Sequence, residues 1–456
     1  MILYQQIDYD PANFMCDFGE HAWCQILQSA PASDGRYDIY VADPIATLQT
    51  FGAHTHIQTQ QHTDTSETDP FELCHRFRHQ LLGASVECEL PFCGGVVGLF
   101  GYDLGRRVES IKERSKAQLR TPDMAVGIYD WALIVDHEQR KRWLVVNHSD
   151  AHLYWQQRRN WLMQHRPSPL GTFKLARSWQ TNLPFDAYQN AFARIQDYII
   201  SGDCYQINLT QQFSCQFQGD IRVAYQRLFS ANQAPYCAYS RLATSTVLSL
   251  SPERFIALNG QHIETKPIKG TRPRSDQSLR DQQLAQELQN SDKDRAENVM
   301  IVDLLRNDIG RVSQPGSVAV PSLFAIESFQ AVHHLVSTVT GTLKTGLSAE
   351  DLLRACFPGG SITGAPKIRA MEIIETLEPH RRNAYCGAIG YISQNGRMDT
   401  NITIRTLVAE DNHLYSWAGG GIIADSIVAD EYQECLDKLA RILPVLKLEE
   451  NDSALA

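Results

Sequence analysis

Long apolar segments are absent from the sequence, because no uninterrupted run approaches the roughly 18 or more residues of a membrane helix. A basic excess is absent too: 42 Lys and Arg stand against 52 Asp and Glu, for a net charge of −10. Nonspecific binding to nucleic acid depends on clustered cations, so this balance argues against it. Repeats and low-complexity segments are also missing, which excludes collagen-like, coiled-coil and disordered chains. We therefore expect neither a membrane nor a nucleic acid as a partner.

Paired cysteines and an early positive charge are lacking as well. The eleven cysteines include no Cys-x-x-Cys motif, and the nearest two, Cys88 and Cys93, have no second pair or histidine cluster to match them. Metal-binding and disulfide frameworks are thus not expected, and we interpret the cysteines as small core residues. No Arg or Lys precedes Arg36, so the N-terminal residues predict neither a signal peptide nor a transit peptide. These features favour a cytoplasmic protein.

The composition is otherwise that of an ordinary globular protein, with 43% hydrophobic and 21% charged residues in a chain of 456. Short runs of β-branched and aromatic residues predict strands, for example at 37–42, 131–135, 247–250 and 388–392. Helical periodicity predicts helices near 150–165 and over 188–201, 296–307 and 430–443. Strands follow one another without regular alternation with helices, so an α+β fold is favoured over a doubly wound sheet.

Composition also suggests how the chain is divided. Strand-like runs dominate residues 1–150, and a polar segment with three prolines, 151–185, follows them. Residues 186–446 mix helical and strand periods, and the tail 447–456 is polar. We expect the two long regions to be joined by the polar segment and the tail to fray.

Glycine-rich segments invite a nucleotide-binding interpretation, which we reject. Gly359–Lys367 approaches the P-loop spacing but has Ala365 and Pro366 where Lys and Ser or Thr are required. Gly419 to Ala424 fits a dinucleotide fingerprint only nominally, because no clear helix follows it. Three adjacent glycines can still offer backbone N–H groups to a carboxylate. A bulge or a tight turn explains them equally well.

Acidic residues recur on single helix faces. Asp294 and Glu297 are three residues apart on one predicted helix, and Glu431, Glu434 and Lys438 share a face of another. Such rows are usually the solvated face of an amphipathic helix. Two of them brought together would suit Mg²⁺, which accepts one or two carboxylates along with waters and substrate oxygens. Periodicity alone does not decide between these interpretations.

A lysine in a predicted loop is a further candidate. Pro267–Thr271 follows a probable strand and carries Lys269 at its centre. Such a lysine is ordinarily surface charge. As a nucleophile it requires a lowered pKa, through burial or through cationic neighbours such as Lys266 and Arg272.

Several blocks of this sequence together resemble the chorismate-utilising enzymes, a family that includes anthranilate, aminodeoxychorismate, isochorismate and salicylate synthases. The blocks cover most of residues 190–440 in family order and include Ser251–Phe255, Pro267–Thr271, Asp294–Asn298, Asp303–Val312, Phe357–Lys367, Ile404–Thr406 and Ala418–Asp425. The resemblance implies the anthranilate synthase component I fold, with two large antiparallel sheets packed as a β-sandwich and helices on the outside. It makes 1–150 the N-terminal region of that fold and 186–446 the chorismate-binding catalytic region.

Within the family, Lys269 favours the aminodeoxychorismate synthase branch, since anthranilate synthases typically carry alanine in this loop. Gln206 stands near the place where isochorismate and salicylate synthases have a general-base lysine, so addition of water is disfavoured. The implied reaction amidates chorismate to 4-amino-4-deoxychorismate, for 4-aminobenzoate and folate biosynthesis, through a lysine-linked intermediate. Anthranilate synthase component I is the alternative. A noncatalytic binding subunit is disfavoured, because it need not retain Lys269, Glu253, Glu297 and Glu434 together.

Family correspondence also implies roles for individual residues. Lys269 is expected to be the nucleophile and Glu253 the general acid, which requires a raised pKa. Mg²⁺ is expected on Glu297 and Glu434, with Glu431 nearby. The expected substrate-binding residues are Thr271, His334, Tyr385, Arg405, Gly419, Gly420, Gly421 and Lys438. For His334 a satisfied core histidine is an equally good interpretation.

The resemblance implies partners as well. The chain has no Gly-x-Cys-x-Gly block of a glutaminase, so a separate glutamine amidotransferase subunit is expected to supply ammonia in a heterodimer. Tryptophan-inhibited relatives carry Leu-Leu-Glu-Ser where this chain has Ile26–Ser29, with Gln28 in place of the acid, which puts feedback inhibition in doubt. A structural tryptophan remains an expectation, in a pocket lined by Ser29, Arg36, Tyr37, Pro235 and Tyr236.

Overall fold

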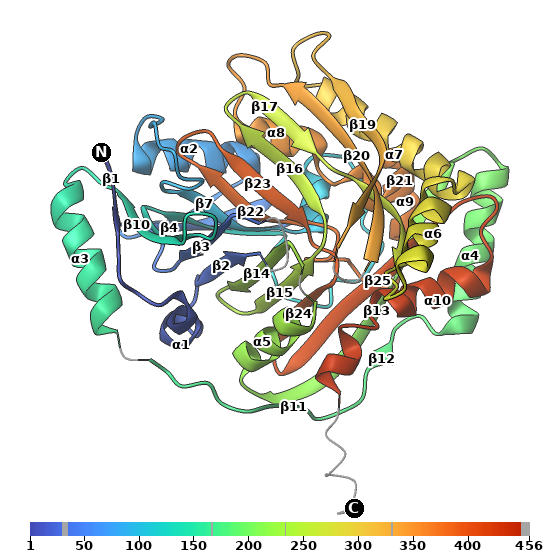
Figure 1. The fold of residues 1–456 in the computed structure, drawn as a ribbon, viewed down its shortest axis with the longest axis horizontal. Coiled ribbons are helices and arrows are strands. Elements are labelled where there is room, and N and C mark those ends of the chain that lie inside the picture. Colours follow the sequence, from blue (N-terminus) through green and yellow to red (C-terminus); the bar gives the residue numbers. More distant parts are fainter. Residues whose placement is uncertain (30–34, 166, 233, 330–331, 448–456) are drawn as a thin grey trace, which may run out of the picture.

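Two large antiparallel sheets, with helices packed around them, form the protein (Figure 1). The structure is a computed structural model that describes residues 1–29, 35–165, 167–232, 234–329 and 332–447. The polar tail predicted from residue 447 onward lies outside these residues except for Lys447. The α+β class and the two large antiparallel sheets expected from the sequence are confirmed.

The first sheet contains 13 strands among the described residues. Its order is β1 (Ile2–Gln6), β10 (Lys141–Asn147), β9 (Trp131–Asp136), β3 (Tyr37–Val41), β2 (Gln25–Gln28), β14 (Tyr236–Arg241), β15 (Thr246–Ser251), β24 (Thr406–Glu410), β25 (His413–Ile422), β13 (Gln206–Gly219) and β11 (Phe173–Leu175). The short strands β12 (Gln180–Thr181) and β21 (Gly364–Ala365) also pair with β13. The long strands β13 and β25 lie side by side and pair over ten residues.

The second sheet contains 12 strands in the described part of the chain. Its order is β18 (Ile268–Pro273), β20 (Val332–Thr342), β17 (His262–Thr265), β16 (Arg254–Asn259), β23 (Met398–Ile402), β22 (Ala388–Ser393), β7 (Gly95–Phe100), β8 (Met124–Tyr129), β4 (Ala46–Phe51), β5 (His54–Thr59) and β6 (Thr63–Ser66). β19 (Ala319–Ser328) pairs with the edge of β20 opposite to β18.

Helices cover the outside of the sheets (Figure 1). They are α1 (Phe14–Phe18), α2 (Pro70–Leu82), α3 (Ala151–Gln164), α4 (Phe185–Ile200), α5 (Ile221–Asn232), α6 (Ser278–Gln289), α7 (Asp292–Gly310), α8 (Ala349–Cys356), α9 (Lys367–Leu377) and α10 (Val428–Lys438). Short 3-10 turns are η1 (Pro11–Asn13), η2 (Tyr102–Arg107), η3 (Gly360–Ile362) and η4 (Leu443–Leu446). No helix among the described residues is long and apolar enough to cross a membrane.

Both long regions of the chain contribute strands to both sheets. In the first sheet β2 pairs with β14, and in the second β7 pairs with β22. Each pairing joins a strand from residues 1–150 to one from residues 186–446 through backbone hydrogen bonds. The division at 151–185 stays a prediction, but the two regions share their sheets.

Some local predictions differ from the structure. The segment 430–443 was expected to be one helix, yet α10 ends at Lys438 and separate turns follow. The segment Pro267–Thr271 was predicted to be a loop, but most of it lies in β18. The bulge or tight turn considered for Gly419–Gly421 is also wrong, because the three glycines lie within β25.

One buried ion pair ties the sheets to the loops around them. Arg382 is 1% exposed, and its guanidinium donates to both carboxylate oxygens of Glu378, at 2.9 and 2.6 Å. The same guanidinium donates to the carbonyls of Ile362 in η3 and Asn208 in β13, at 2.8 and 2.7 Å. A buried guanidinium is stable when its charge is paired and its donors are satisfied. Arg382 meets both conditions and so fixes η3 against β13.

Candidate active site

Glu253 lies between the end of β15 and the start of β16, where the chain passes from one sheet to the other. Its N–H group donates to the hydroxyl oxygen of Ser251 at 3.2 Å, and its carbonyl accepts from the N–H of Ile402 at 3.0 Å. The residue is 6% exposed. Burial raises the pKa of its carboxyl to about 7, although the positive charge of Lys269 opposes that shift. Near neutral pH this carboxyl can therefore hold or release a proton.

Lys269 projects from β18 beside Glu253. Its ammonium nitrogen donates to the carbonyl of Ser361 at 3.3 Å, and its backbone is paired with Leu335 in β20. The register between the two strands shifts just after Lys269, at a bulge centred on Gly270. The lysine predicted as a loop residue is thus held by a strand, which gives its side chain a defined direction.

The bulge at Gly270 requires glycine for two reasons. Its φ of +73° lies in the left-handed region, which side chains other than glycine rarely adopt. A Cβ at this position would also lie 2.7 Å from Leu288 Cδ1 and 2.8 Å from Asp294 Cγ. Bulges re-aim the side chains next to them. Here the bulge separates the direction of Lys269 from that of Thr271.

Thr271 and His334 face each other across β18 and β20. The Thr271 hydroxyl and His334 Nδ1 are 2.9 Å apart. Burial lowers the pKa of His334 to about 4, and the nearby charge of Arg405 lowers it further. His334 is therefore neutral at physiological pH, and the structure brings it together with Thr271 and Arg405 as the sequence predicted.

Arg405 supplies a guanidinium without a protein partner. No hydrogen bond or ion pair holds its side chain among the described residues. Burial and the charge of Arg441 lower its pKa, while the charge of Glu253 raises it. Nearby, Tyr385 is buried and stacks on Trp417, with ring centroids 6.1 Å apart. An unpaired guanidinium in a largely dry position favours binding of an anion.

Three carboxylates from two helices lie close together. Glu297 comes from α7, and Glu431 and Glu434 come from α10. Burial raises the pKa of Glu297 and of Glu431, and each is raised further by the other carboxylates. Lysines neutralise part of this charge: Lys438 Nζ is 2.6 Å from Glu434, and Lys293 Nζ is 3.6 Å from Glu431. The two acidic rows predicted on separate helices therefore do meet.

The glycines of β25 open a space between these carboxylates and the strand. A Cβ at Gly420 would lie 2.9 Å from Glu431 Oε2 and 3.7 Å from Glu434 Oε1. Among the described residues no three His, Cys, Asp or Glu side chains converge closely enough to bind a metal by themselves. Mg²⁺ needs only one or two carboxylates. The all-oxygen donor set and the room left by Gly420 fit that ion.

Two of the three glycines turn their N–H groups away from β13. Gly419 and Gly421 pair with Thr210 and Asn208, whose own N–H groups donate to Glu378 and to the carbonyl of Thr363. Residues paired in this way exchange no hydrogen bonds with each other. On the other side β24 pairs with β25 only as far as Ser416. Gly419 and Gly421 therefore direct their N–H groups to an open edge of the sheet.

Lys438 completes this edge, because its ammonium group donates to the carbonyl of Gly419 at 2.9 Å. Sequence reasoning named Lys438 but missed two neighbours. Ser361 accepts from Lys269, and Lys293 approaches Glu431. Ser361 lies in the glycine-rich block already noted, whereas Lys293 precedes the acidic row by only one residue. Neither position is distinguished by its residue type.

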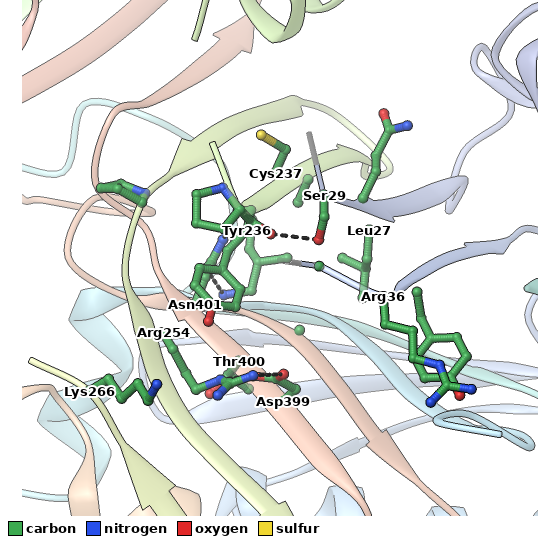
Figure 2. A pocket seen from close by; sticks show the side chains of 18 of the residues that line it. Leu27, Ser29, Arg36, Tyr236, Cys237, Arg254, Lys266, Asp399, Thr400 and Asn401 are labelled. Carbon is green, nitrogen blue, oxygen red and sulfur yellow. Dashed lines mark hydrogen bonds and ion pairs between the residues drawn. The ribbon is translucent and has the colours of Figure 1, made fainter. Parts of the chain in front are cut away.

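A separate cavity of about 410 Å³ lies behind β18 (Figure 2). All five residues predicted for a tryptophan pocket line it: Ser29, Arg36, Tyr37, Pro235 and Tyr236. The Ser29 hydroxyl donates to the carbonyl of Pro235 at 2.8 Å. Ile268 lines the cavity too, and adjacent strand residues point to opposite faces. The cavity and Lys269 therefore lie on opposite faces of β18.

Comparisons with known proteins show what the chain is similar to. The sequence pattern of the chorismate binding enzymes matches residues 24–444. Aminodeoxychorismate synthase component 1 from Klebsiella aerogenes is 54% identical over 428 residues, covering 93% of this chain and 94% of that protein. The protein of the same name from Escherichia coli (strain K12) is 51% identical and covers 93% of each chain.

A solved structure with the same fold is anthranilate synthase component I from Streptococcus pneumoniae TIGR4. It superposes with a TM-score of 0.80 at 30% identity, covering 90% of this chain and 93% of that chain. The fold expected from the sequence is thereby confirmed.

The raised pKa of Glu253 predicts how stability depends on pH. Between about pH 4.5 and 7 the folded protein keeps a proton on this carboxyl that the unfolded chain releases, so stability falls as pH rises through that window. Glu253→Gln cannot lose that proton. Its free energy of unfolding, relative to the unmodified protein, should therefore rise by about 3 kcal/mol across the window.

Urea denaturation of both proteins at several pH values measures this difference. Glu287→Gln serves as a control, because it removes a carboxylate from the surface of α6 that pairs with Arg280. A stability difference for Glu253→Gln that stays constant from pH 4 to 8 would contradict the prediction.

Proposed function

The chain belongs to the chorismate-binding enzyme family, and on that premise we propose that it is component 1 of an aminodeoxychorismate synthase. The identity of 51–54% to two such proteins over 93% of the chain carries this proposal. The enzyme converts chorismate and ammonia to 4-amino-4-deoxychorismate, a step in 4-aminobenzoate and folate biosynthesis, and we place it in the cytoplasm. Every catalytic candidate lies between Glu253 and Lys438, which supports residues 186–446 as the catalytic region.

The proposed first step forms a covalent bond between Lys269 and the substrate. The free amine of Lys269 attacks C2 of chorismate, both conjugated ring double bonds shift by one position towards C4, and the C4–oxygen bond breaks. Hydroxide is a poor leaving group, so Glu253 donates the proton that lets it leave as water. The pKa of about 7 keeps a useful fraction of this carboxyl protonated near neutral pH.

The second step replaces the lysine by ammonia. Ammonia adds at C4, both double bonds shift back, and the C2–nitrogen bond to Lys269 breaks. The proton lost by the added nitrogen balances the one that the departing amine takes up. Two conjugate displacements through the ring diene thus achieve what direct replacement of the C4 hydroxyl does with difficulty.

Chorismate carries two carboxylates, and the site offers separate groups for each. The unpaired guanidinium of Arg405, with Tyr385 beside it, suits the enolpyruvyl carboxylate. The N–H groups that Gly419 and Gly421 direct to the sheet edge, and the ammonium group of Lys438, add further donors. Neutral His334 and Thr271 complete the wall that faces the ring.

Glu297 and Glu434 are the residues that would hold Mg²⁺, with Glu431 beside them. Bound there, the ion would neutralise the ring carboxylate, which otherwise meets acidic residues. Gly420 leaves the room that the carboxylates need, and Ser426 orients Glu431 by donating to its Oε1 at 2.7 Å. Lys293 and Lys438 balance the acidic charge of the pair of helices.

A second component is expected, because relatives named component 1 imply one. We propose that it is a glutamine amidotransferase subunit, which releases ammonia for the second step. The cavity behind β18 is the proposed site of a bound tryptophan. Its volume of about 410 Å³ lies in the range of small-molecule sites, and Arg36, Tyr37 and Tyr236 offer both charge and aromatic surface.

The covalent step predicts a modified Lys269. With chorismate present, intact-mass analysis should show a mass increase equal to chorismate less one water. Lys269→Ala should lose this adduct, and its product formation from ammonium salt and Mg²⁺ should fall by about a thousandfold or more. Lys141→Ala is the control, because Lys141 lies in β10 of the N-terminal region and contacts the ring of Trp143.

Chromatography of the same reactions identifies the product. Anthranilate as the main product would overturn the proposed activity. An unmodified Lys269 during turnover to 4-amino-4-deoxychorismate would overturn only the covalent step.

Removing one carboxylate should weaken magnesium binding directly. Glu434→Gln loses a negatively charged oxygen donor, so calorimetric titration with Mg²⁺ should give a dissociation constant at least about tenfold higher than that of the unmodified protein. Glu372→Gln on the outer face of α9 is the control. Equal affinities for all three proteins would show that the ion binds elsewhere.

The tryptophan proposal predicts binding in the cavity behind β18. Calorimetry should detect one tryptophan per chain, or acid extraction should release it from the purified protein. Ser29→Leu fills part of the cavity and removes a hydroxyl, so it should abolish binding. Ser85→Leu is a matched control, because the Ser85 hydroxyl also donates to a carbonyl but lies outside the cavity. Tryptophan bound equally by Ser29→Leu would contradict this assignment.

A further inference from the structure

One face of β13 is polar although the strand is buried. Gln206, Asn208, Thr210 and Gln212 occupy alternate positions, and each is at most 7% exposed. We call these four residues the polar row. The alternate positions between them are mostly apolar and pack into the hydrophobic core. A sheet that buries both faces would ordinarily be apolar on both, so the polar row needs an explanation.

Much of the hydrogen-bonding capacity of the polar row is unused. Gln206 Oε1, Asn208 Oδ1 and Gln212 Nε2 have no hydrogen-bond partner among the described protein groups. Leaving one such atom unpaired is costly in free energy, so native proteins rarely keep several in succession without a ligand or water to bind. Their alignment on one strand indicates a path for a small polar molecule.

One end of the polar row lies at the proposed chorismate site. A Cβ at Gly421 would lie 2.0 Å from Gln206 Nε2, and one at Gly419 would lie 2.8 Å from Asn208 Oδ1. These are the two glycines that direct their N–H groups to the open edge of β25. The row therefore contacts the strand that is proposed to bind substrate.

Away from the chorismate site, contacts connect the polar row through Arg382 to Tyr102. The guanidinium that donates to the carbonyl of Asn208 lies over the ring of Tyr102, 4.8 Å from its centroid. The Tyr102 hydroxyl also has no partner among the described groups. Tyr102, Arg106 and Glu375 line a small hollow of about 10 Å³, the space of a single water-sized molecule. Arg106 is partly exposed there, so the hollow lies near the surface.

The chemistry of this path suits ammonia. Ammonia has the size of a water molecule and offers N–H donors to the unpaired oxygens of Tyr102, Asn208 and Gln206. The carboxylate of Glu378 lies beside the path, but its oxygens already accept from Arg382 and from the N–H of Thr210. The Glu378 carboxylate is therefore already paired with protein donors, and the buried charge of Arg382 disfavours ammonium beside it. Neutral ammonia is the form that can attack carbon.

On the basis of the proposed function, we infer that ammonia released by the partner enters at the hollow beside Tyr102 and Arg106 and reaches the chorismate site along the polar row. The amidotransferase is then expected to release its ammonia at the surface around η2 and α9. Ammonia from solution can also enter the chorismate site directly, because Glu434 and Lys438 are exposed at the mouth of that site.

Two variants test this path in the complex of the chain with its amidotransferase. Tyr102→Phe removes a single hydroxyl, and Asn208→Leu removes the amide while keeping the same branched skeleton of heavy atoms. With glutamine as the nitrogen source, the ratio of glutamate released to 4-amino-4-deoxychorismate formed should rise at least threefold in both variants. With saturating ammonium chloride, the kcat and the KM for chorismate of Tyr102→Phe should change less than twofold. Asn208 lies against Gly419 at the chorismate site, so Asn208→Leu is judged by the ratio alone.

Thr47→Val is the matched control, because the Thr47 hydroxyl in β4 is likewise buried and unpartnered but lies far along the other sheet. Its ratio should stay that of the unmodified protein. An unchanged ratio in both Tyr102→Phe and Asn208→Leu would overturn the path, and so would an equal loss of glutamine-dependent and ammonium-dependent activity in Tyr102→Phe. Failure of the unmodified chain to form the amine from ammonium chloride would instead reject the proposed function on which the path depends.

Discussion

The architecture around the site depends on the buried ion pair between Arg382 and Glu378. A guanidinium at this depth is tolerated only because four hydrogen bonds and one carboxylate satisfy it. Its acceptors come from the end of α9, from η3 and from β13, and the ring beneath it belongs to η2. One side chain therefore holds the N-terminal region against the catalytic strands. The position of Ser361, next to Ile362 in η3, follows from it.

Charge is organised by burial in the rest of the site. Lys269 donates to the carbonyl of Ser361 and lies beside Glu253. Burial raises the pKa of the Glu253 carboxyl, and the positive charge of Lys269 limits that rise. Across the site, the Arg405 side chain has no hydrogen bond or ion pair with the described residues, while three glutamates lie beside two lysines. The chain has a net charge of −10, yet at this site it has cations for one carboxylate of the proposed substrate. Beside the other substrate carboxylate it has a set of oxygen donors for a metal ion. The acidic composition and a dianionic substrate are compatible for this reason.

Sequence periodicity predicted the elements that have a strong local signal. The strands at Trp131, Thr246 and Ala388 and the helix that begins at Asp292 lie where apolar spacing placed them. It failed at β18 and at the glycines of β25, because Lys, Gly, Thr and Pro locally favour loops. Pairing with β20 and β13, strands more than 60 residues away in the chain, makes both segments extended. Such pairing overrides local propensity and leaves no local trace.

The sequence by itself determined which chemical groups are available: a lysine and a glutamate in matching blocks, acidic rows on two helices, an arginine after a strand, and five residues that line one cavity. Only the tertiary structure decided the states of these groups. The pKa of Glu253 depends on burial and on Lys269, sixteen positions further along the chain. The unpaired atoms of β13 become visible only once their neighbours are in place. Desolvation and Coulomb interactions act through space, so residue order alone does not fix them.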